Sequence, residues 1–293
     1  MAEENRPTVD GGPDRTLSAV TGPSILIEPP RGWRLLNLRE LWLYRELLLQ
    51  LAWRDIRIRY KQTLIGAAWA VLQPFLTMVV FSIFFGRFAG IPSDGLPYPV
   101  FSYAGLLPWT FFAEGMRRAA ESLVGNANLV SRVYFPRILI PLGAILAALV
   151  DFAFAFVVLI GMMIFYRIPV TWNILYLPAF LALAFLAALG VGLWLSALNV
   201  QYRDVRYTLG FIIQIWLFAT PVIYPTSLLK GTWKVLVSLN PMTSVVEGSR
   251  WALLGSGSPP SGILWASVAA VAFVLVGGLL VFQRMERAFA DVI

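Results

Sequence analysis

The chain has 293 residues, of which 58% are hydrophobic and 13% are charged, whereas a soluble domain carries about 25% charged residues. This composition excludes an ordinary water-soluble protein and predicts a polytopic membrane protein. The sequence contains no cysteine and no histidine, which excludes disulfides, thiolate nucleophiles, imidazole bases and His or Cys metal sites. The net charge of +7 is spread around apolar segments, which favours an anionic lipid leaflet or an acidic partner over nucleic acid.

The N-terminal 61 residues differ in character from the rest of the chain. Residues 1–30 are polar, rich in Pro, Gly, Glu and Asp, and lack apolar periodicity, so we expect a disordered cytosolic tail. Charged residues such as Glu3 and Arg6 stand where the apolar core of a signal peptide would begin, so the first span is expected to direct insertion. We expect a cytosolic amphipathic helix region over 31–61 and a transmembrane domain over 62–293.

Residues Glu46 to Lys61 have the period of a basic amphipathic helix. The pattern fits either a helix that lies in the lipid headgroup layer or one that also docks a cytosolic partner. Both interpretations place the helix on the cytosolic face. Its apolar side comprises Leu49, Ala52, Trp53 and Ile56, and its polar side comprises Gln50, Arg54, Arg57 and Lys61.

Six apolar segments follow, each near the ~20 residues that cross a bilayer. Because Pro97, Pro99 and Pro108 fall in the second segment, we expect it to be kinked, to begin irregularly and to continue past Glu114. With both termini in the cytosol, cytosolic segments hold 18 of the 23 basic residues, as the positive-inside rule requires. The expected spans are Leu64–Gly86, Gly95–Ala113, Ile138–Tyr166, Ile174–Leu198, Tyr207–Tyr224 and Ile263–Phe282.

The external region between the fifth and sixth spans is too apolar for a solvated loop. Asn240-Pro241 divides it into Ser227–Leu239 and Met242–Leu254, and neither piece is long enough to cross the bilayer. These pieces are either interfacial helices anchored by Trp233 and Trp251 or a re-entrant helical hairpin in the outer leaflet. The predicted fold is therefore all-α, with six transmembrane helices, an N-terminal amphipathic interface helix and a re-entrant external hairpin.

The sequence offers little catalytic chemistry. None of its three lysines, Lys61, Lys230 and Lys234, stands in a phosphate-binding Walker A loop, so we expect no ATP hydrolysis by this chain. Asp151 is the one acid well inside an expected span, which disfavours a proton-driven carrier. It is a candidate functional residue or, equally, a carboxylate that holds helix packing by hydrogen bonds.

Aromatic residues inside the spans are candidates for a stacking surface that sugar rings slide along, although lipid contact or core packing explains most of them. Two short charged loops, Gly125–Arg137 and Asn199–Tyr207, are either ordinary cytosolic turns or part of a docking surface for a partner beside the amphipathic helix. The candidate channel or substrate-contact residues are Trp69, Phe75, Trp109, Phe112, Asp151 and Trp216.

Several motifs occur in a specific order between about residues 45 and 290. They are Trp53 to Trp69 followed by Leu72-Gln73-Pro74, the Asn126 to Pro136 loop, Leu198-Asn199-Val200 with Tyr202-Arg203-Asp204, Thr220 to Tyr224, and Leu239 to Met242. Together they resemble the permease subunit of ABC-2 type polysaccharide exporters, which serve O antigen, capsule or teichoic acid.

The resemblance implies a homodimeric permease in the bacterial cytoplasmic membrane, bound to two separate ATPase subunits that hold ATP and Mg. It implies no cofactor in this chain and a polyprenyl diphosphate-linked polysaccharide as substrate. It also implies that Pro225 to Leu254 is the re-entrant hairpin and that the amphipathic helix and the two loops contact the ATPase. The expected coupling residues are Arg54, Arg57, Arg59, Asn126, Arg132, Tyr134, Arg137, Tyr202, Arg203 and Asp204.

Two other functions are weighed against polysaccharide export. An ABC-2 exporter of a small amphiphile or drug would keep the fold but would contain a closed lateral pocket in place of a wide aromatic-lined channel. A membrane-embedded glycan-processing enzyme would need paired acids on one face, and the isolated Asp151 argues against that.

Overall fold

The computed structural model describes residues 38–61, 66–256, 262–286 and 289. The chain divides into two units, Met1–Arg34 and Leu35–Ile293. The first unit, and with it the tail expected over 1–30, lies outside the described residues, and every described helix belongs to the second unit. Across those described ranges the chain forms helices, turns and irregular connections without any strand. The prediction of an all-α fold is confirmed.

The helices of the second unit are of very different lengths. In chain order they begin with α1 (Leu38–Leu43), α2 (Arg45–Lys61), α3 (Gly66–Phe81), the π-helical turn η1 (Ser82–Phe88), α4 (Tyr98–Gly125), α5 (Ala127–Arg132) and α6 (Leu139–Phe165). They continue with η2 (Trp172–Tyr176), α7 (Leu177–Gln201), α8 (Val205–Ala219), η3 (Thr226–Leu228), α9 (Thr232–Ser238), α10 (Pro241–Leu254) and α11 (Gly262–Glu286).

Four helical stretches are long and apolar enough to cross a membrane. They are Ala68–Phe88, Leu139–Phe165, Trp172–Gln201 and Leu264–Glu286, and they coincide with the first, third, fourth and sixth expected spans. The amphipathic helix expected over Glu46 to Lys61 is present as α2.

The other two expected spans differ from their predicted bounds. Helix α4 begins at Tyr98, after an irregular segment, and extends to Gly125, so the second expected span is shifted and carries charges in its last three turns. Helix α8 ends at Ala219, not Tyr224, and has 15 residues, or about 22 Å of length. It stops because Pro221 disfavours a helical conformation at Thr220, which is extended.

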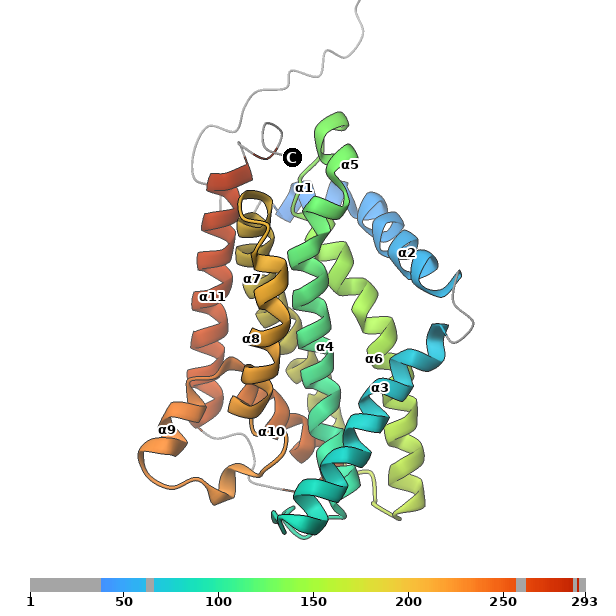
Figure 1. The fold of residues 1–293 in the computed structure, drawn as a ribbon, viewed down its shortest axis with the longest axis vertical. Coiled ribbons are helices and arrows are strands. Elements are labelled where there is room, and N and C mark those ends of the chain that lie inside the picture. Colours follow the sequence, from blue (N-terminus) through green and yellow to red (C-terminus); the bar gives the residue numbers. More distant parts are fainter. Residues whose placement is uncertain (1–37, 62–65, 257–261, 287–288, 290–293) are drawn as a thin grey trace, which may run out of the picture. The chain divides into compact units, whose positions relative to one another are not determined.

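Helix α4 forms the centre of the bundle. It packs against α6 on one side and α7 on the other, α7 packs in turn against α11, and α2 lies along α6 (Figure 1). Small residues allow these close approaches: a Cβ atom added at Gly190 of α7 would lie 2.8 Å from the backbone nitrogen of Leu275 in α11. Because lipid offers no hydrophobic drive between helices, such backbone contact is a principal source of packing energy.

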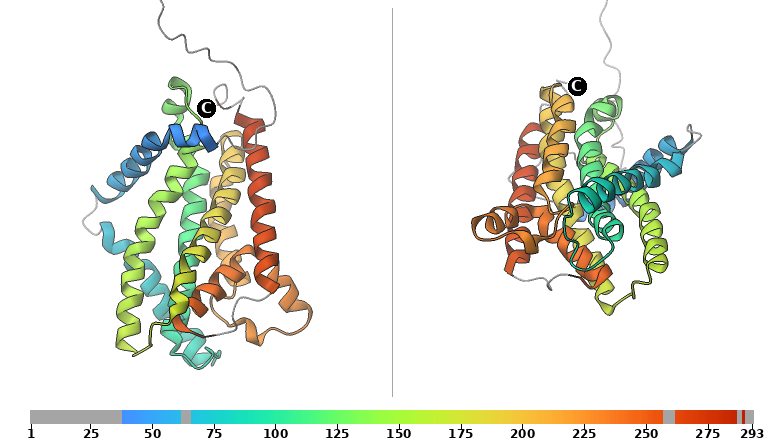
Figure 2. Two further views of the ribbon diagram at one scale, coloured as in Figure 1. Left: turned by 180° about the vertical axis from the view of Figure 1, so that it is seen from behind. Right: turned by 60° about the horizontal axis from the view of Figure 1, so that its bottom comes forward.

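The connecting elements separate onto two ends of the bundle. Helices α1 and α5 and the end of α11 lie at one end, and α9, α10 and η1 lie at the other (Figure 2). The segments expected in the cytosol are thus grouped together, opposite the segments expected outside. The direction in which the bundle crosses the membrane stays a prediction.

The region after α8 folds into two unequal helices around Asn240. The Asn240 side chain caps α10 by accepting from the Met242 backbone N–H at 3.0 Å, accepts from Trp216 Nε1 at 3.1 Å and donates to Thr220 Oγ1 at 2.9 Å. Helix α9 is exposed and has only 7 residues, fewer than the 13 expected. Helix α10 is mostly buried between α4, α7 and α11.

Arg250 of α10 fixes this region to the bundle. Its side chain is 3% exposed, and its three nitrogens donate to the carbonyls of Phe101 at 3.1 Å, Pro221 at 2.6 Å and Val222. The guanidinium also stacks 3.7 Å from the Phe101 ring centroid. Burial lowers the pKa of Arg250 to about 10, so the group stays charged at neutral pH. It satisfies carbonyls that the break after α8 leaves without helical partners.

We expect replacement of Arg250 by Met to destabilise the protein strongly. The apolar side chain leaves three buried carbonyl contacts unmade, which costs about 3 kcal/mol or more. The midpoint of thermal unfolding in detergent, followed by tryptophan fluorescence, is the measurement. Lys234→Met on the exposed helix α9 is the matched control, and equal midpoints for the two variants would contradict the anchoring role.

Candidate functional site

A cluster of charged side chains joins three helices near the middle of α6. We define the charged junction as Arg59 and Tyr60 of α2, Glu114 and Arg118 of α4, and Asp151 of α6. Asp151 lies near the middle of an apolar 27-residue helix, where an isolated carboxylate would be costly. The structure surrounds it with donors from the two neighbouring helices.

Both oxygens of the Asp151 carboxylate are engaged. Oδ2 accepts from Arg118 and lies 3.0 Å from Nη1 of Arg59, and Oδ1 accepts from the Tyr60 hydroxyl. The Asp151 and Arg118 side chains are only 12% and 15% exposed, so these ion pairs are poorly screened by solvent. Burial, together with the hydrogen bond to Asp151, raises the pKa of Tyr60 above its ordinary value, which keeps the phenol a donor.

The charges around the junction form a continuous network of ion pairs. Glu114 lies 3.8 Å from Arg59, 3.9 Å from Arg118 and 2.7 Å from Arg117. Glu121, two turns further along α4, pairs with Arg117 at 3.4 Å. These ion pairs form one partly buried network, which Arg206 of α8 joins at 3.9 Å from Glu121.

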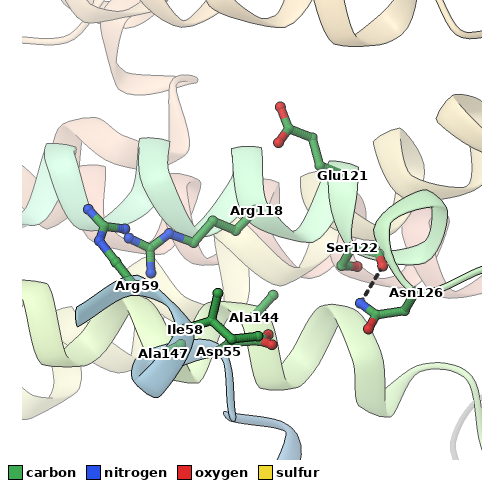
Figure 3. Close-up of a pocket in the computed structure, with 9 residues that line it drawn as sticks. All are labelled: Asp55, Ile58, Arg59, Arg118, Glu121, Ser122, Asn126, Ala144 and Ala147. Atoms are coloured by element: carbon green, nitrogen blue, oxygen red, sulfur yellow. Dashed lines mark hydrogen bonds between the residues drawn. The ribbon is translucent and has the colours of Figure 1, made fainter. Parts of the chain in front are cut away.

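A cavity of about 280 Å³ opens beside the junction between α2, α4 and α6 (Figure 3). Figure 3 shows the Arg59 and Arg118 guanidinium groups side by side at one end, with Asn126 at the other. This mixture of cations, carboxylates and an amide suits a polar ligand group. The described residues contain no cluster of three or more carboxylates fit for a metal ion. The cavity is lined by Asp55, Ile58, Arg59, Arg118, Glu121, Ser122, Asn126, Ala144 and Ala147.

The expected coupling residues of α2 point in different directions. Arg54 pairs with its neighbour Asp55 at 2.8 Å, Arg57 is exposed, and Arg59 turns inward to Asp151. The apolar side of the helix is divided as well, since Ala52 is buried against the bundle and Trp53 is exposed.

The expected coupling residues of the two loops lie mostly on the surface. Asn126 follows α4, and its Nδ2 donates to the Ser122 carbonyl at 2.8 Å. Arg137 contacts Glu286 at the end of α11 through its backbone N–H and its guanidinium. The remaining members are exposed: Arg132, Tyr134, Tyr202, Arg203 and Asp204.

The channel candidates fall into two groups. Trp109, Phe112 and Trp216 form one aromatic cluster, with ring centroids 5.1 to 6.3 Å apart. Trp109 is 3% exposed and Phe112 is fully covered, whereas Trp69 and Phe75 on α3 are 50% and 37% exposed. Within one chain, Trp109 and Phe112 are therefore core residues, Trp216 is half-buried against them, and Trp69 and Phe75 present ring surface outward.

Sequence reasoning missed several residues of these sites. Tyr60, Glu114 and Arg118 were not predicted, although Glu114, Arg117, Arg118 and Glu121 recur at the spacing of one helix face, which was the available signal. Arg250 was counted only as an external charge. Its place in the mostly apolar Met242–Leu254 segment, one turn after Glu247, with which it pairs at 3.6 Å, was the clue to a buried position.

This architecture, with apolar helices long enough to span a bilayer and a charged helix junction between them, defines a polytopic helical membrane protein. The family model described as ABC-2 type transporter matches residues 46–254, which include α2, the charged junction and α10. The chain belongs to the ABC-2 type transporter family.

Individual relatives align over most of their length. The chain is 27% identical over 256 residues to the O-antigen export system permease protein RfbA of Myxococcus xanthus, covering 86% of this chain and 97% of that protein. It is 22% identical over 254 residues to a protein of the same name from Klebsiella pneumoniae, with coverage of 85% and 95%. It is also 26% identical over 239 residues to the polysialic acid transport protein KpsM of Escherichia coli, with coverage of 80% and 92%.

We expect the two tryptophan groups to respond differently to alanine. Trp109→Ala removes a buried ring and should cost about 3–5 kcal/mol of stability, whereas Trp69→Ala should cost less than about 1 kcal/mol. Thermal unfolding in detergent and the export rate of each variant are the measurements. If Trp69→Ala lowers the export rate without lowering the unfolding midpoint, a channel role for that ring is favoured. If it lowers the export rate and the midpoint together, the ring is a packing residue.

Proposed function

We propose that this chain is the membrane-spanning permease subunit of an ATP-driven exporter that moves lipid-linked polysaccharide across the bacterial cytoplasmic membrane. The observation that carries the proposal is the similarity over at least 80% of the chain to permeases named for O-antigen export and polysialic acid transport. The six spans and the re-entrant hairpin formed by α9 and α10 belong to the same proposal.

The chemistry of the cargo supports a conduit of this kind. A polysaccharide exposes many hydroxyl groups, and each costs several kcal/mol to bury without a partner in hydrocarbon. Passage therefore requires a continuous polar or aromatic path and an external energy source. No lysine of this chain stands in a Walker A loop, so ATP and Mg would be bound by two separate nucleotide-binding subunits.

A second copy of the chain is part of the proposed assembly. Helix α8 buries only Leu209 fully and exposes Tyr207, Phe211, Ile215 and Phe218 in one stripe. The cavity beside the charged junction, about 280 Å³, is smaller than a polymer path would be, so we place the conduit between two chains. A homodimer would cover apolar surface and create the conduit at its axis.

The proposed docking surface for the ATPase subunits is the end of the bundle that carries α1, α5 and the turn between α7 and α8. Arg57 of α2 and the exposed residues of both loops present charges and aromatic rings there. Arg59, together with Arg118, would offer guanidinium groups to a diphosphate head group that enters the cavity, because guanidinium pairs with phosphate in a bidentate manner.

Deletion of the gene for this chain should remove the polymer from the cell surface while lipid-linked polymer accumulates on the cytosolic side of the membrane. Extraction and immunodetection of the polymer in surface and internal fractions measure the outcome. Complementation with the intact gene is the control. Normal surface polymer with altered resistance to amphiphilic drugs would instead favour export of a small amphiphile.

Charge reversal at Arg54 and Arg57 should weaken assembly with the ATPase subunit. Two glutamates in place of the arginines would repel an acidic partner surface. We expect the dissociation constant of the complex to rise about tenfold, which is about 1.4 kcal/mol of binding free energy, and less ATPase subunit to co-purify. The matched control is the double reversal of Arg87 in η1 and Lys234 in α9, two exposed residues on elements at the opposite end of the bundle. Unchanged assembly and export in the Arg54 and Arg57 variant would refute their coupling role.

A further inference from the structure

Helix α2 is held to the bundle by very little apolar contact. Of its 17 residues only Leu51 and Ala52 are buried. Leu49, Trp53 and Ile58 are all more than half exposed. Hydrophobic packing therefore fixes the first half of the helix. In the half that ends at Lys61, the edge-to-face contact of the Tyr60 ring with Phe154 of α6, 6.0 Å between centroids, is joined by the ionic contacts of Arg59.

Successive contacts between α2 and α6 occur in the same order along both helices. Leu51 faces Gly143, where an added Cβ atom would lie 3.4 Å from the Leu51 Cβ. Eight or nine residues later, Arg59 and Tyr60 meet Asp151. The two helices thus run in the same direction, with contact points about 12 Å apart on each.

Asp151 is the point at which three helices meet. Its carboxylate receives Arg59 and Tyr60 from α2 and Arg118 from α4 while belonging itself to α6. We propose that Asp151 is a positioning residue that joins α2, α4 and α6 into one moving body, so that displacement of α2 by a partner subunit is carried into the bundle. This inference rests on the proposed function.

The geometry distinguishes this role from contact with the polymer. Both carboxylate oxygens already accept hydrogen bonds or ion pairs from the protein, and the side chain is largely covered. A neutral side chain at this position would leave the Arg59 and Arg118 guanidinium groups close together with one shared acid, Glu114, near both. Like charges at low dielectric repel, so α2 and α4 would separate.

Helix α4 extends the connection to the opposite end of the bundle. Arg118 lies 17 residues after Phe101, or about 26 Å along the helix, and the Phe101 carbonyl accepts from Arg250 of α10. Close by, the Tyr98 hydroxyl donates to the Ile223 carbonyl at 2.8 Å. The same continuous helix is therefore fixed to α2 and α6 at one end and to α10 and the segment after α8 at the other. A movement of α2 would reach the external region through α4.

The first experiment compares Asp151→Asn with two controls in the intact transporter. Asp151→Asn should lower polymer export at least tenfold while the ATPase subunit stays bound, and Asp151→Glu should retain more export than Asp151→Asn. Asp94→Asn makes the same chemical change in an exposed external turn, where an amide can still accept from Ser227 Oγ, and should leave export unchanged. Full export by Asp151→Asn would overturn the proposal.

The second experiment adds a covalent connection between α2 and α6. Because the chain has no cysteine, a pair introduced as Leu51→Cys and Gly143→Cys is the only disulfide it can form within itself, and the Cβ separation suits one. The oxidised pair should leave export by the otherwise unaltered protein within about twofold, because α2 and α6 move as one body. Loss of export on oxidation, reversed by reductant, would show that α2 must move relative to α6 and would overturn the proposal.

A third measurement is independent of any cargo. A spin label on Ile58→Cys, an exposed position of α2, should become more mobile when Asp151→Asn is added, and should not when Asp94→Asn is added. Unchanged mobility would refute the anchor whatever the protein transports. If deletion of the gene left the surface polymer unchanged while the spin-label mobility changed as expected, the proposed cargo would be wrong and the role of the junction would stand.

Discussion

The structure depends on how a few charges are accommodated among apolar helices. An ionised group away from water needs partners for its charge and for each of its hydrogen-bonding atoms. Asp151 finds them in two arginines and a tyrosine from neighbouring helices, and Arg250 finds them in three backbone carbonyls. Because these partners come from distant parts of the chain, each buried charge specifies one arrangement of helices where apolar packing alone would tolerate several.

Helix α4 contributes to both arrangements. Its first turns carry small and aromatic residues that approach α10 closely, and Gly105 is necessary there because a Cβ atom would overlap the Arg250 guanidinium. Its last turns carry acids and arginines, of which Glu114 pairs with Arg59 of α2 and Arg118 pairs with Asp151 of α6. The helix is thus apolar at one end and ionic at the other, which gives it the two kinds of contact that the fold requires.

The sequence predicted the helical class, four of the spans and the amphipathic helix, because long apolar runs and a clear 3.6-residue period are local signals. It did not predict the end of α8 at Ala219, since the apolar run continues through Thr220 to Tyr224 and hides the effect of Pro221. Asp151 was recognised as a special residue from its position. Its partners were not, because Arg59 and Arg118 lie 92 and 33 residues away and only the three-dimensional packing of α2 and α4 brings them together.

In the proposed assembly, where α8 is a span, its shortness has a consequence for the lipid beside the part of α8 that the second copy leaves uncovered. At about 22 Å the helix is roughly 8 Å shorter than the ~30 Å hydrocarbon layer, and the chain beyond it is irregular. Hydrophobic mismatch of this size is relieved when the adjacent leaflet thins or its acyl chains tilt. In that assembly an amphiphile with a bulky polar head would cross a shorter apolar distance beside α8 than elsewhere in the bilayer.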